Sequence, residues 1–264
     1  VVKGYELPNT IDKNTLVVAT SVSGNTIETI TTLESANKKN CKVIAFSSGG
    51  MIESFCTKNN IEFRKLPQIH SPRASFPSYV YSILKTLNSI IPITKQDIIN
   101  SLEQLEHTYE EISSTNLDDS NPSVNLANWI TGTPVIYYPH GLETVAIRFK
   151  NSLQENAKTH AISENVVESS HNGIVSWERP SSMVPIMIEG KDDHIKTKER
   201  WKILREYFEV NNIKYSKIQS VDGNILSKVM CLIYTLDYST IYYAVQLGID
   251  PSPIRSIDFI KDRL

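Results

Sequence analysis

Short apolar runs alternate with amphipathic helical segments along the chain, and this alternation limits the possible fold more than any other feature. The runs Leu16–Ala19 and Lys42–Phe46 are short and rich in apolar residues, and each is followed by a segment with apolar residues at helical spacing. Strands that alternate with helices are typical of parallel sheets. The sequence therefore predicts an α/β fold with mainly parallel sheets flanked by helices.

The expected elements fall into two sets, on either side of a polar, turn-rich stretch at 113–123. The first set comprises strands at 16–19, 42–46 and 61–63 and helices at 26–38, 51–58, 78–89 and 95–113. The second set comprises strands at 134–138, 184–188 and 214–220 and helices at 143–160, 196–210, 224–247 and 251–264. We therefore predict two similar α/β domains, over 1–113 and 114–264.

Composition excludes several classes of protein. The net charge of −2 gives no basic field for nucleic acid or an anionic membrane, and no apolar run approaches the roughly 20 residues that span a bilayer. Cys41, Cys56 and Cys231 are widely spaced and outside any CxxC, which favours a reducing cytoplasm. The histidines are scattered and no carboxylates cluster at ligand spacing, so we expect no metal site.

The segment Ser21–Thr26 follows the first expected strand and precedes the first helix. Ligands of open parallel sheets bind beyond the carboxyl ends of the strands, and a helix N-terminus there attracts anions. Ser21, Ser23 and Thr26 offer hydroxyl donors, while Gly24 lets the backbone come close to a ligand. The loop has no P-loop lysine. We interpret it as a phosphate-binding loop.

A helix cap is the alternative interpretation of these residues. Ser23 with Thr26, or Asn25 with Glu28, has the spacing of a capping box, in which a side chain accepts a hydrogen bond from the first turn of the helix. The two interpretations are compatible. The complete hexapeptide, placed after a buried strand, favours phosphate binding.

The segment Ser21–Thr29 resembles the phosphosugar-binding signature of SIS (sugar isomerase) domains, and Ser47–Gly50 resembles the small-residue turn after the next strand of those domains. Further segments match, in the same order, the archaeal-type bifunctional phosphoglucose/phosphomannose isomerases: His70–Ala74, Glu155–Lys158, Ser170–Glu178, Gly248–Pro251 and Ile260–Lys261. The match runs through nearly the whole chain. The chain is thus similar to a family of enzymes with two SIS domains.

The resemblance implies a homodimer that interconverts fructose 6-phosphate with glucose 6-phosphate or mannose 6-phosphate through a cis-enediol(ate), without a cofactor. The implied phosphate- and sugar-binding residues are Ser21, Ser23, Gly24, Asn25 and Thr26. Glu155 would be the base that moves a proton between C1 and C2. His171, supplied across the dimer interface, and Lys261 would assist ring opening, and Arg73 would stabilise the enediolate.

Each of these four residues also has an ordinary alternative role. Glu155, with Lys158 three residues later on an expected helix, fits a solvated surface glutamate. His171 precedes an Asn-Gly turn and fits an exposed loop histidine. Arg73 fits a surface charge in a loop, and Lys261 fits a lysine that complements the dipole of a terminal helix.

Three other functions stay open from the sequence. They are a non-catalytic phosphosugar-binding SIS module, another SIS sugar-phosphate isomerase such as an amidotransferase isomerase domain or phosphoheptose isomerase, and a structural α/β dimerisation protein. The Glu155 and His171 segments favour the phosphoglucose/phosphomannose isomerase. The chain opens with Val1, and its first strand matches the second strand of that family. We therefore expect the family's first strand and Gly/Ser-rich loop to be missing before residue 1.

Overall fold

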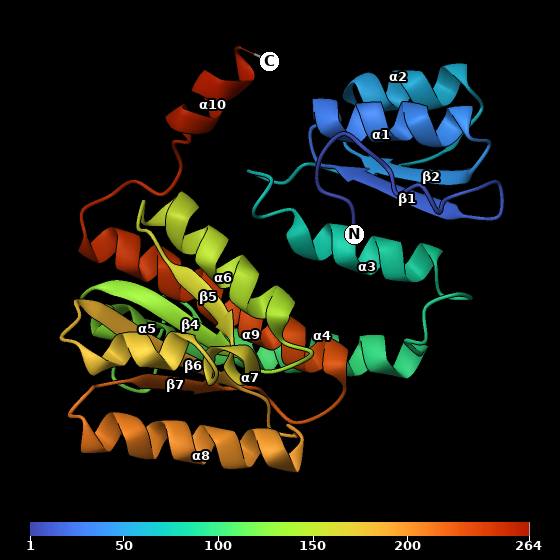
Figure 1. Cartoon of the computed structure of the whole chain (residues 1–264). Helices are drawn as coiled ribbons and strands as arrows, with labels where there is room; N and C mark the ends of the chain where they lie inside the picture. Colours follow the sequence, from blue (N-terminus) through green and yellow to red (C-terminus); the bar gives the residue numbers. More distant parts are fainter. Residues whose placement is uncertain (264) are drawn as a thin grey trace. The chain divides into compact units, whose positions relative to one another are not determined.

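The computed structural model describes residues 1–263, and its contacts divide the chain into two compact units (Figure 1). The first unit runs from Val1 to Thr94, and the second begins at Lys95. Both units have parallel strands flanked by helices, as the sequence predicted. No helix within the described residues is both long enough and apolar enough to cross a membrane.

The units divide at residue 94 rather than at the predicted boundary of 113. The reason is that helix α4 (Lys95–Ile112) packs against α9 (Ile225–Gln246), which belongs to the second unit. Ile112 at the end of α4 is fully buried. Its carbonyl oxygen accepts a hydrogen bond of 2.6 Å from the Tyr242 hydroxyl on α9.

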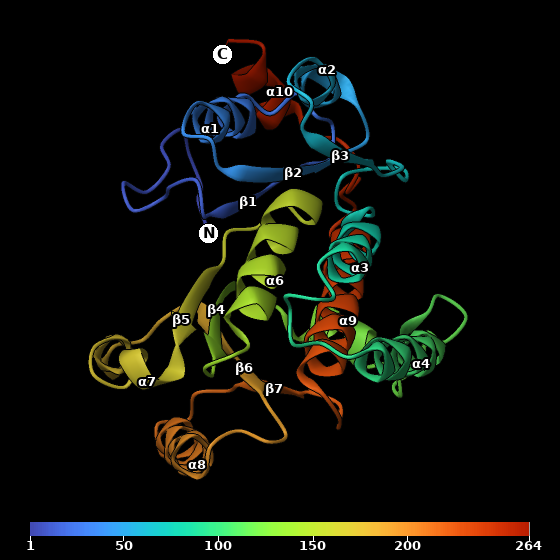
Figure 2. The same cartoon turned by 90° about the vertical axis from the view of Figure 1, so that its right-hand side faces the viewer.

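The first unit contains a sheet of parallel strands in the order β1-β2-β3. These strands are β1 (Leu16–Ser21), β2 (Lys42–Ser47) and β3 (Glu62–Lys65). The helices of the unit are α1 (Ile27–Lys38), α2 (Gly50–Lys58) and α3 (Phe76–Thr86). Figure 2 shows α1 and α2 over one face of the sheet and α3 over the other.

Both faces of this sheet carry apolar side chains because successive strand residues point to opposite sides. The cluster under α1 and α2 comprises Ala19, Ile30, Leu33, Ala45, Ile52 and Cys56. The buried cluster on the α3 face comprises Ile44, Phe46 and Tyr79. The register that this packing requires places Ser21, the last residue of β1, opposite Ser47, the last residue of β2. The loops that follow the two strands therefore start side by side.

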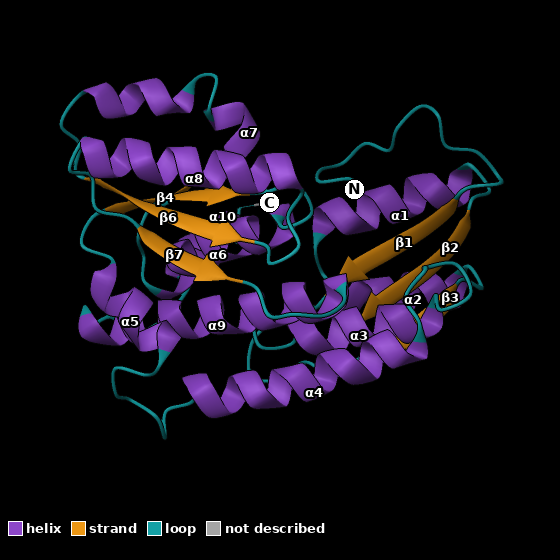
Figure 3. Cartoon of the chain, turned by 90° about the horizontal axis from the view of Figure 1, so that it is seen from below, coloured by secondary structure: helices purple, strands orange, loops and turns teal. Residues whose placement is uncertain are grey.

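The second unit contains a parallel sheet in the order β5-β4-β6-β7. Its strands are β4 (Thr133–Tyr138), β5 (Ile162–Asn165), β6 (Met183–Glu189) and β7 (Ser216–Gln219). Besides α4 and α9, its helices are α5 (Pro122–Trp129), α6 (Glu143–Asn156), α7 (Val166–Ser169), the 3-10 helix η1 (Gly173–Glu178), α8 (Ile195–Val210) and α10 (Arg255–Lys261). The chain winds outward from β4 in both directions, which is the doubly wound arrangement. Figure 3 shows α8 on one face of the sheet and α5 and α9 on the other.

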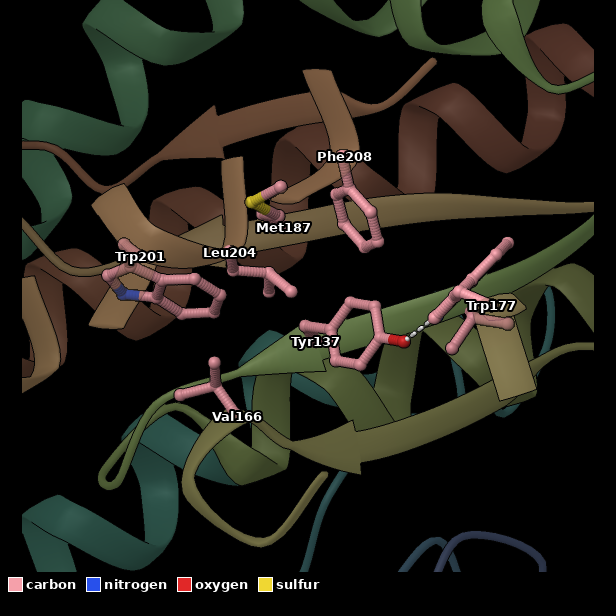
Figure 4. Close-up of a cluster of buried hydrophobic side chains, with 8 residues drawn as sticks. Tyr137, Val166, Trp177, Met187, Trp201, Leu204 and Phe208 are labelled. Carbon is pink, nitrogen blue, oxygen red and sulfur yellow. Dashed lines mark hydrogen bonds between the residues drawn. The ribbon is translucent and has the colours of Figure 1, made fainter. Parts of the chain in front are cut away.

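The core of the second unit is an aromatic cluster between the sheet and α8 (Figure 4). Its buried residues are Val135, Tyr137, Val166, Trp177, Met187, Trp201, Leu204 and Phe208. The indole N–H of Trp177 donates a hydrogen bond of 2.7 Å to the Tyr137 hydroxyl, so both polar atoms are satisfied inside the cluster. Burying one such large side chain contributes about 1.5–3 kcal/mol to folding.

Three features of the second unit differ from the sequence-based prediction. Strand β5, helices α5 and α7 and the 3-10 helix η1 were not predicted. The helix predicted at 143–160 ends at Asn156, because Lys158 adopts a left-handed backbone with a φ of 53°. The last helix, predicted to reach Leu264, ends at Lys261, and Leu264 itself lies outside the described residues.

Candidate active site

The loop that follows β1 is held in shape by its own serine and threonine side chains. Ser21 is buried, and its Oγ accepts a hydrogen bond of 3.1 Å from the Gly24 N–H. A hydrogen bond of 2.7 Å also joins Ser21 Oγ to Thr26 Oγ1. At the exposed rim, Ser23 Oγ accepts a hydrogen bond of 3.3 Å from the Asn25 N–H. The buried Ser21 side chain therefore stabilises the loop through its hydrogen bonds, while Ser23 and Thr26 are exposed at the loop surface.

This loop interlocks with the loop that follows β2. The Asn25 side chain accepts a hydrogen bond of 3.0 Å from the Met51 N–H, and the Gly24 carbonyl oxygen accepts one of 3.0 Å from the Ile52 N–H. Both donors belong to the first turn of α2. A Cβ atom on Gly24 would overlap the carbonyl oxygen of Gly49, so only glycine fits there. Asn25 and Gly24 thus accept hydrogen bonds from two backbone N–H groups in the first turn of α2.

The start of α1 is open by comparison. Thr26 is its N-cap residue, but among residues 1–263 no side chain accepts a hydrogen bond from the first turn of this helix. The capping box that the sequence also allowed is therefore not formed. The free N–H groups of the first turn and the positive end of the helix dipole lie beside the exposed Ser23 and Thr26 hydroxyls. This arrangement suits an anionic group such as a phosphate.

Arg73 lies in the turn between β3 and α3, where it is half-buried. The buried Ser75 holds this turn: its Oγ accepts a hydrogen bond of 3.0 Å from the Ile69 N–H and donates one of 3.0 Å to the Ser71 carbonyl oxygen. Arg73 is thus carried by a shaped turn at the carboxyl edge of the sheet that also bears the Ser21–Thr26 loop.

In the second unit, Glu155 lies in the last turn of α6, and polar contacts fix that helix to α9. The buried Asn156 side chain donates a hydrogen bond of 2.7 Å to Thr240 Oγ1. One helical turn earlier, Ser152 Oγ donates to Asp237 Oδ1 at 2.6 Å, and the same carboxylate pairs with Arg148 at 2.6 Å. The helix end that carries Glu155 is therefore anchored from its buried side.

A cavity of about 740 Å³ opens on the other side of this helix end. Its lining includes Asn151, Gln154, Glu155 and Lys158 on one wall and Asp250 with residues 253–257 on the other. The Lys158 ammonium donates hydrogen bonds to the carbonyl oxygens of Glu155 (2.5 Å), Pro253 (2.8 Å) and Pro251 (3.4 Å). Lys158 therefore ties the two walls together. The sequence singled out Glu155, and the Gly248–Pro251 match includes Asp250, but no role was predicted for residues 253–257 of the facing wall.

The opposite wall adds a second acidic group. The Ser252 N–H donates a hydrogen bond of 2.8 Å to Asp250 Oδ1, and this bond lowers the pKa of the Asp250 carboxyl. Asp250 is therefore ionised at neutral pH. The cavity holds a helix-borne carboxyl group, a second carboxylate and two basic side chains, which can support acid–base chemistry on a polar substrate.

Comparison with known proteins places these features in a family. Residues 119–264, more than half of the chain, match the family described as the C-terminal SIS domain of bacterial phosphoglucose isomerases. The chain belongs to this family.

Two relatives align with almost the whole of this chain. The bifunctional phosphoglucose/phosphomannose isomerase of Caldicellulosiruptor bescii is 30% identical, over 99% of this chain and 80% of that protein. The D-glucosamine-6-phosphate 4-epimerase of Sulfolobus acidocaldarius is 29% identical, over 96% of this chain and 77% of that protein. The crystal structure of tagatose-6-phosphate ketose/aldose isomerase from Escherichia coli has the same fold, with a TM-score of 0.73 and 12% identity over 92% of this chain and 72% of that one.

Two other residues predicted for the SIS active site lie outside the lining of the Glu155 cavity. His171 is exposed in the turn between α7 and η1, where its backbone N–H donates a hydrogen bond of 2.9 Å to the Glu168 carbonyl oxygen. Lys261 is exposed at the end of α10. Of the residues predicted in the second unit, the cavity contains Glu155 alone.

The sequence also missed a buried acidic group beside the His171 turn. Glu164 Oε2 is buried and has no hydrogen-bond partner within the described residues. Gly173 packs directly onto it, since a Cβ atom at that position would lie 2.5 Å from Oε2. Burial raises the pKa of the Glu164 carboxyl. Glu164 also lies beside Tyr137 in the sheet, and burial, together with the Glu164 charge, raises the pKa of Tyr137 to about 12.

Proposed function

We propose that this chain interconverts fructose 6-phosphate with glucose 6-phosphate, mannose 6-phosphate or both. The observation that carries this proposal is the similarity to the Caldicellulosiruptor bescii isomerase, which extends over 99% of the chain. The site geometry adds independent support. One unit has an open helix N-terminus beside exposed hydroxyls, and the other has a glutamate in a polar cavity.

Glu155 is the proposed base. It removes a proton from C1 or C2 of the open-chain sugar phosphate, which leaves a cis-enediolate, and returns the proton to the neighbouring carbon. Support comes from the anchoring of the last turn of α6 by Asn156, which gives the carboxyl group a fixed place at the cavity wall. General acid–base catalysis of this kind contributes about 10²–10⁴-fold to the rate.

The phosphate of the substrate is proposed to bind at the start of α1. The exposed hydroxyls of Ser23 and Thr26 donate to its oxygens together with the free N–H groups of the first helical turn. Ser21, Gly24 and Asn25 support this site by holding the loop in shape. Arg73 is retained as a residue that stabilises the enediolate, because it lies at the same edge of the sheet.

Ring opening is assigned to His171 and Lys261, with His171 supplied by a second copy of the chain in a homodimer. The exposure of His171 and its place outside the lining of the Glu155 cavity support this part of the proposal. A heterodimer of the His171→Ala and Glu155→Gln variants would then contain one site with both native residues. Mixing the two inactive variants should restore part of the activity.

The proposal is tested by comparing wild type with Glu155→Gln, which keeps the shape of the side chain and removes the base. Each protein is incubated with fructose 6-phosphate, and glucose 6-phosphate and mannose 6-phosphate are measured side by side. We expect kcat to fall by about 10²–10⁴-fold while fructose 6-phosphate still binds. In D2O, the wild-type product should carry deuterium from the solvent, because the transferred proton exchanges at the base.

Glu206→Gln, on the exposed face of α8, is the matched control and should keep full activity. Retained activity of Glu155→Gln would exclude Glu155 as the base. If wild type binds fructose 6-phosphate but converts it to neither product, the chain is a phosphosugar-binding module. Conversion of glucosamine 6-phosphate alone would instead favour the activity named for the Sulfolobus acidocaldarius relative.

A further inference from the structure

The Glu155 cavity contains two basic side chains, Lys158 and Arg255, and these differ in how the protein uses them. The Lys158 ammonium has three N–H donors, and three carbonyl oxygens accept from it, those of Glu155, Pro251 and Pro253. These three hydrogen bonds hold the two walls of the cavity together. Lys158 therefore has little left to offer a substrate.

Arg255 is in the opposite situation. It is the first residue of α10 and lines the cavity opposite the α6 wall that carries Glu155. It is exposed, and no hydrogen bond or ion pair engages its guanidinium within residues 1–263. A guanidinium carries five N–H donors in a planar fork that suits bidentate binding of an oxyanion.

We propose that Arg255 stabilises the negative charge that forms on the sugar when Glu155 removes its proton. This inference rests on the proposed isomerase function. When the C–H bond breaks, its electron pair forms the C=C bond of the enediolate, and the carbonyl π electrons move onto the carbonyl oxygen. That oxygen is bonded to the carbon next to the one that loses the proton. A cation in the same cavity as the base is therefore suited to donate hydrogen bonds to it.

The remaining charges of the cavity make this role more specific. Asp250 is ionised, and Glu155 becomes neutral when it takes the proton while the sugar gains a negative charge. Besides Glu155 and Arg255, the charged side chains that line the cavity are the Asp250 carboxylate and a lysine already engaged by three carbonyl groups. Arg255 therefore adds to the stabilisation of the enediolate that the proposed function assigns to Arg73. Arg255 binds more strongly to the enediolate than to the neutral carbonyl group. Its contribution therefore belongs to kcat rather than to substrate binding.

The test compares Arg255→Gln and Arg255→Lys with wild type, using fructose 6-phosphate as substrate and a sugar-phosphate hydroxamate as an inhibitor that mimics the enediolate. We expect Arg255→Gln to lower kcat by about 10²–10³-fold with only a small change in KM. The inhibition constant of the hydroxamate should rise in parallel, because it resembles the transition state. Arg255→Lys, which keeps the charge and loses the fork, should fall between Arg255→Gln and wild type.

Arg263→Gln is the matched control. Arg263 is an exposed arginine that follows α10, stacks on the Phe259 ring at 3.6 Å and lies outside the cavity lining. It should leave kcat and hydroxamate inhibition unchanged. An unchanged kcat in Arg255→Gln, or an effect on KM alone, would overturn the role of Arg255 while leaving the isomerase function intact. Absence of wild-type turnover would overturn both.

Discussion

An alanine at position 24 would place its Cβ atom on the carbonyl oxygen of Gly49. Its backbone would also have to adopt the left-handed conformation of Gly24, with a φ of +73°. The strained backbone and the overlap together should make Gly24→Ala less stable by on the order of 3 kcal/mol. The overlap also forces apart the two loops that meet at this residue. We therefore expect weaker fructose 6-phosphate binding, measured by calorimetry, and a lower midpoint of urea unfolding.

Gly141→Ala separates the effect of backbone strain from the effect of the overlap with Gly49. Gly141 also has a positive φ, +88°, but a Cβ atom there would meet nothing within 4 Å. This control should lose only about 1–2 kcal/mol from the backbone strain and should bind substrate as wild type does. Equal losses of binding in the two variants would show that the contact between the loops is unimportant.

The roles within the Ser21–Thr26 loop show how far sequence reasoning reaches at the scale of single residues. The loop could be predicted, because hydroxyl side chains and a glycine follow a strand. The separate roles of its residues could not be predicted, since the Ser21 side chain bonds inside the loop and the Asn25 side chain bonds to the first turn of α2. These roles depend on the register of β1 against β2, which brings two distant loops together. Arg255 was missed for a similar reason, because a lone arginine in a terminal segment has no motif.

At the scale of elements, the sequence predicted those strands whose residues form an apolar run or alternate between apolar and polar. The run at 134–138 is apolar because β4 lies inside the sheet. Strand β5, with the sequence Ile-Ser-Glu-Asn, lies at the edge and has no such pattern. It is a strand because its backbone pairs with β4, not because of its side chains. Its polar residues also include Glu164, the acid with an unpartnered buried oxygen.

Glu164 should make the stability of the fold depend on pH. Burial raises the pKa of its carboxyl in the folded state, so between its ordinary range and this raised value the folded protein binds more protons than the unfolded chain. Its contribution to stability is full at low pH and is lost as the pH rises through the raised pKa. Glu164→Gln removes this loss. It should be more stable than wild type at neutral pH by on the order of 1 kcal/mol.

Thermal unfolding between pH 4 and pH 8 is the measurement. The difference between Glu164→Gln and wild type should grow with pH, whereas Glu206→Gln, at an exposed position on α8, should follow wild type. A difference that stays constant across this range would mean that Glu164 keeps the same charge in the folded and unfolded states.

At the scale of the whole molecule, helix α4 decides where the chain can be divided. A polar stretch at 113–123 suggested a boundary at residue 113, because polar, turn-rich sequence is typical of linkers. The contacts place the boundary at residue 94, since α4 covers α9. Besides the buried Ile112, Tyr109 of α4 stacks on Tyr234 of α9 with their ring centroids 6.5 Å apart. Polarity of a connecting loop does not reveal which unit the helix before it joins.

Two fragments test this division. A fragment over 95–264 keeps α4, and a fragment over 114–264 lacks it. Removing α4 uncovers the face of α9 on which it packs, and loss of the buried Ile112 alone costs about 1.5–3 kcal/mol, so the shorter fragment should be less stable by about 3 kcal/mol or more. Trp129, Trp177 and Trp201 all lie in the second unit, so tryptophan fluorescence during urea unfolding reports on it directly. We expect a cooperative transition for 95–264 and a much lower midpoint for 114–264. Equal midpoints would place α4 outside the folding unit and return the boundary to residue 113.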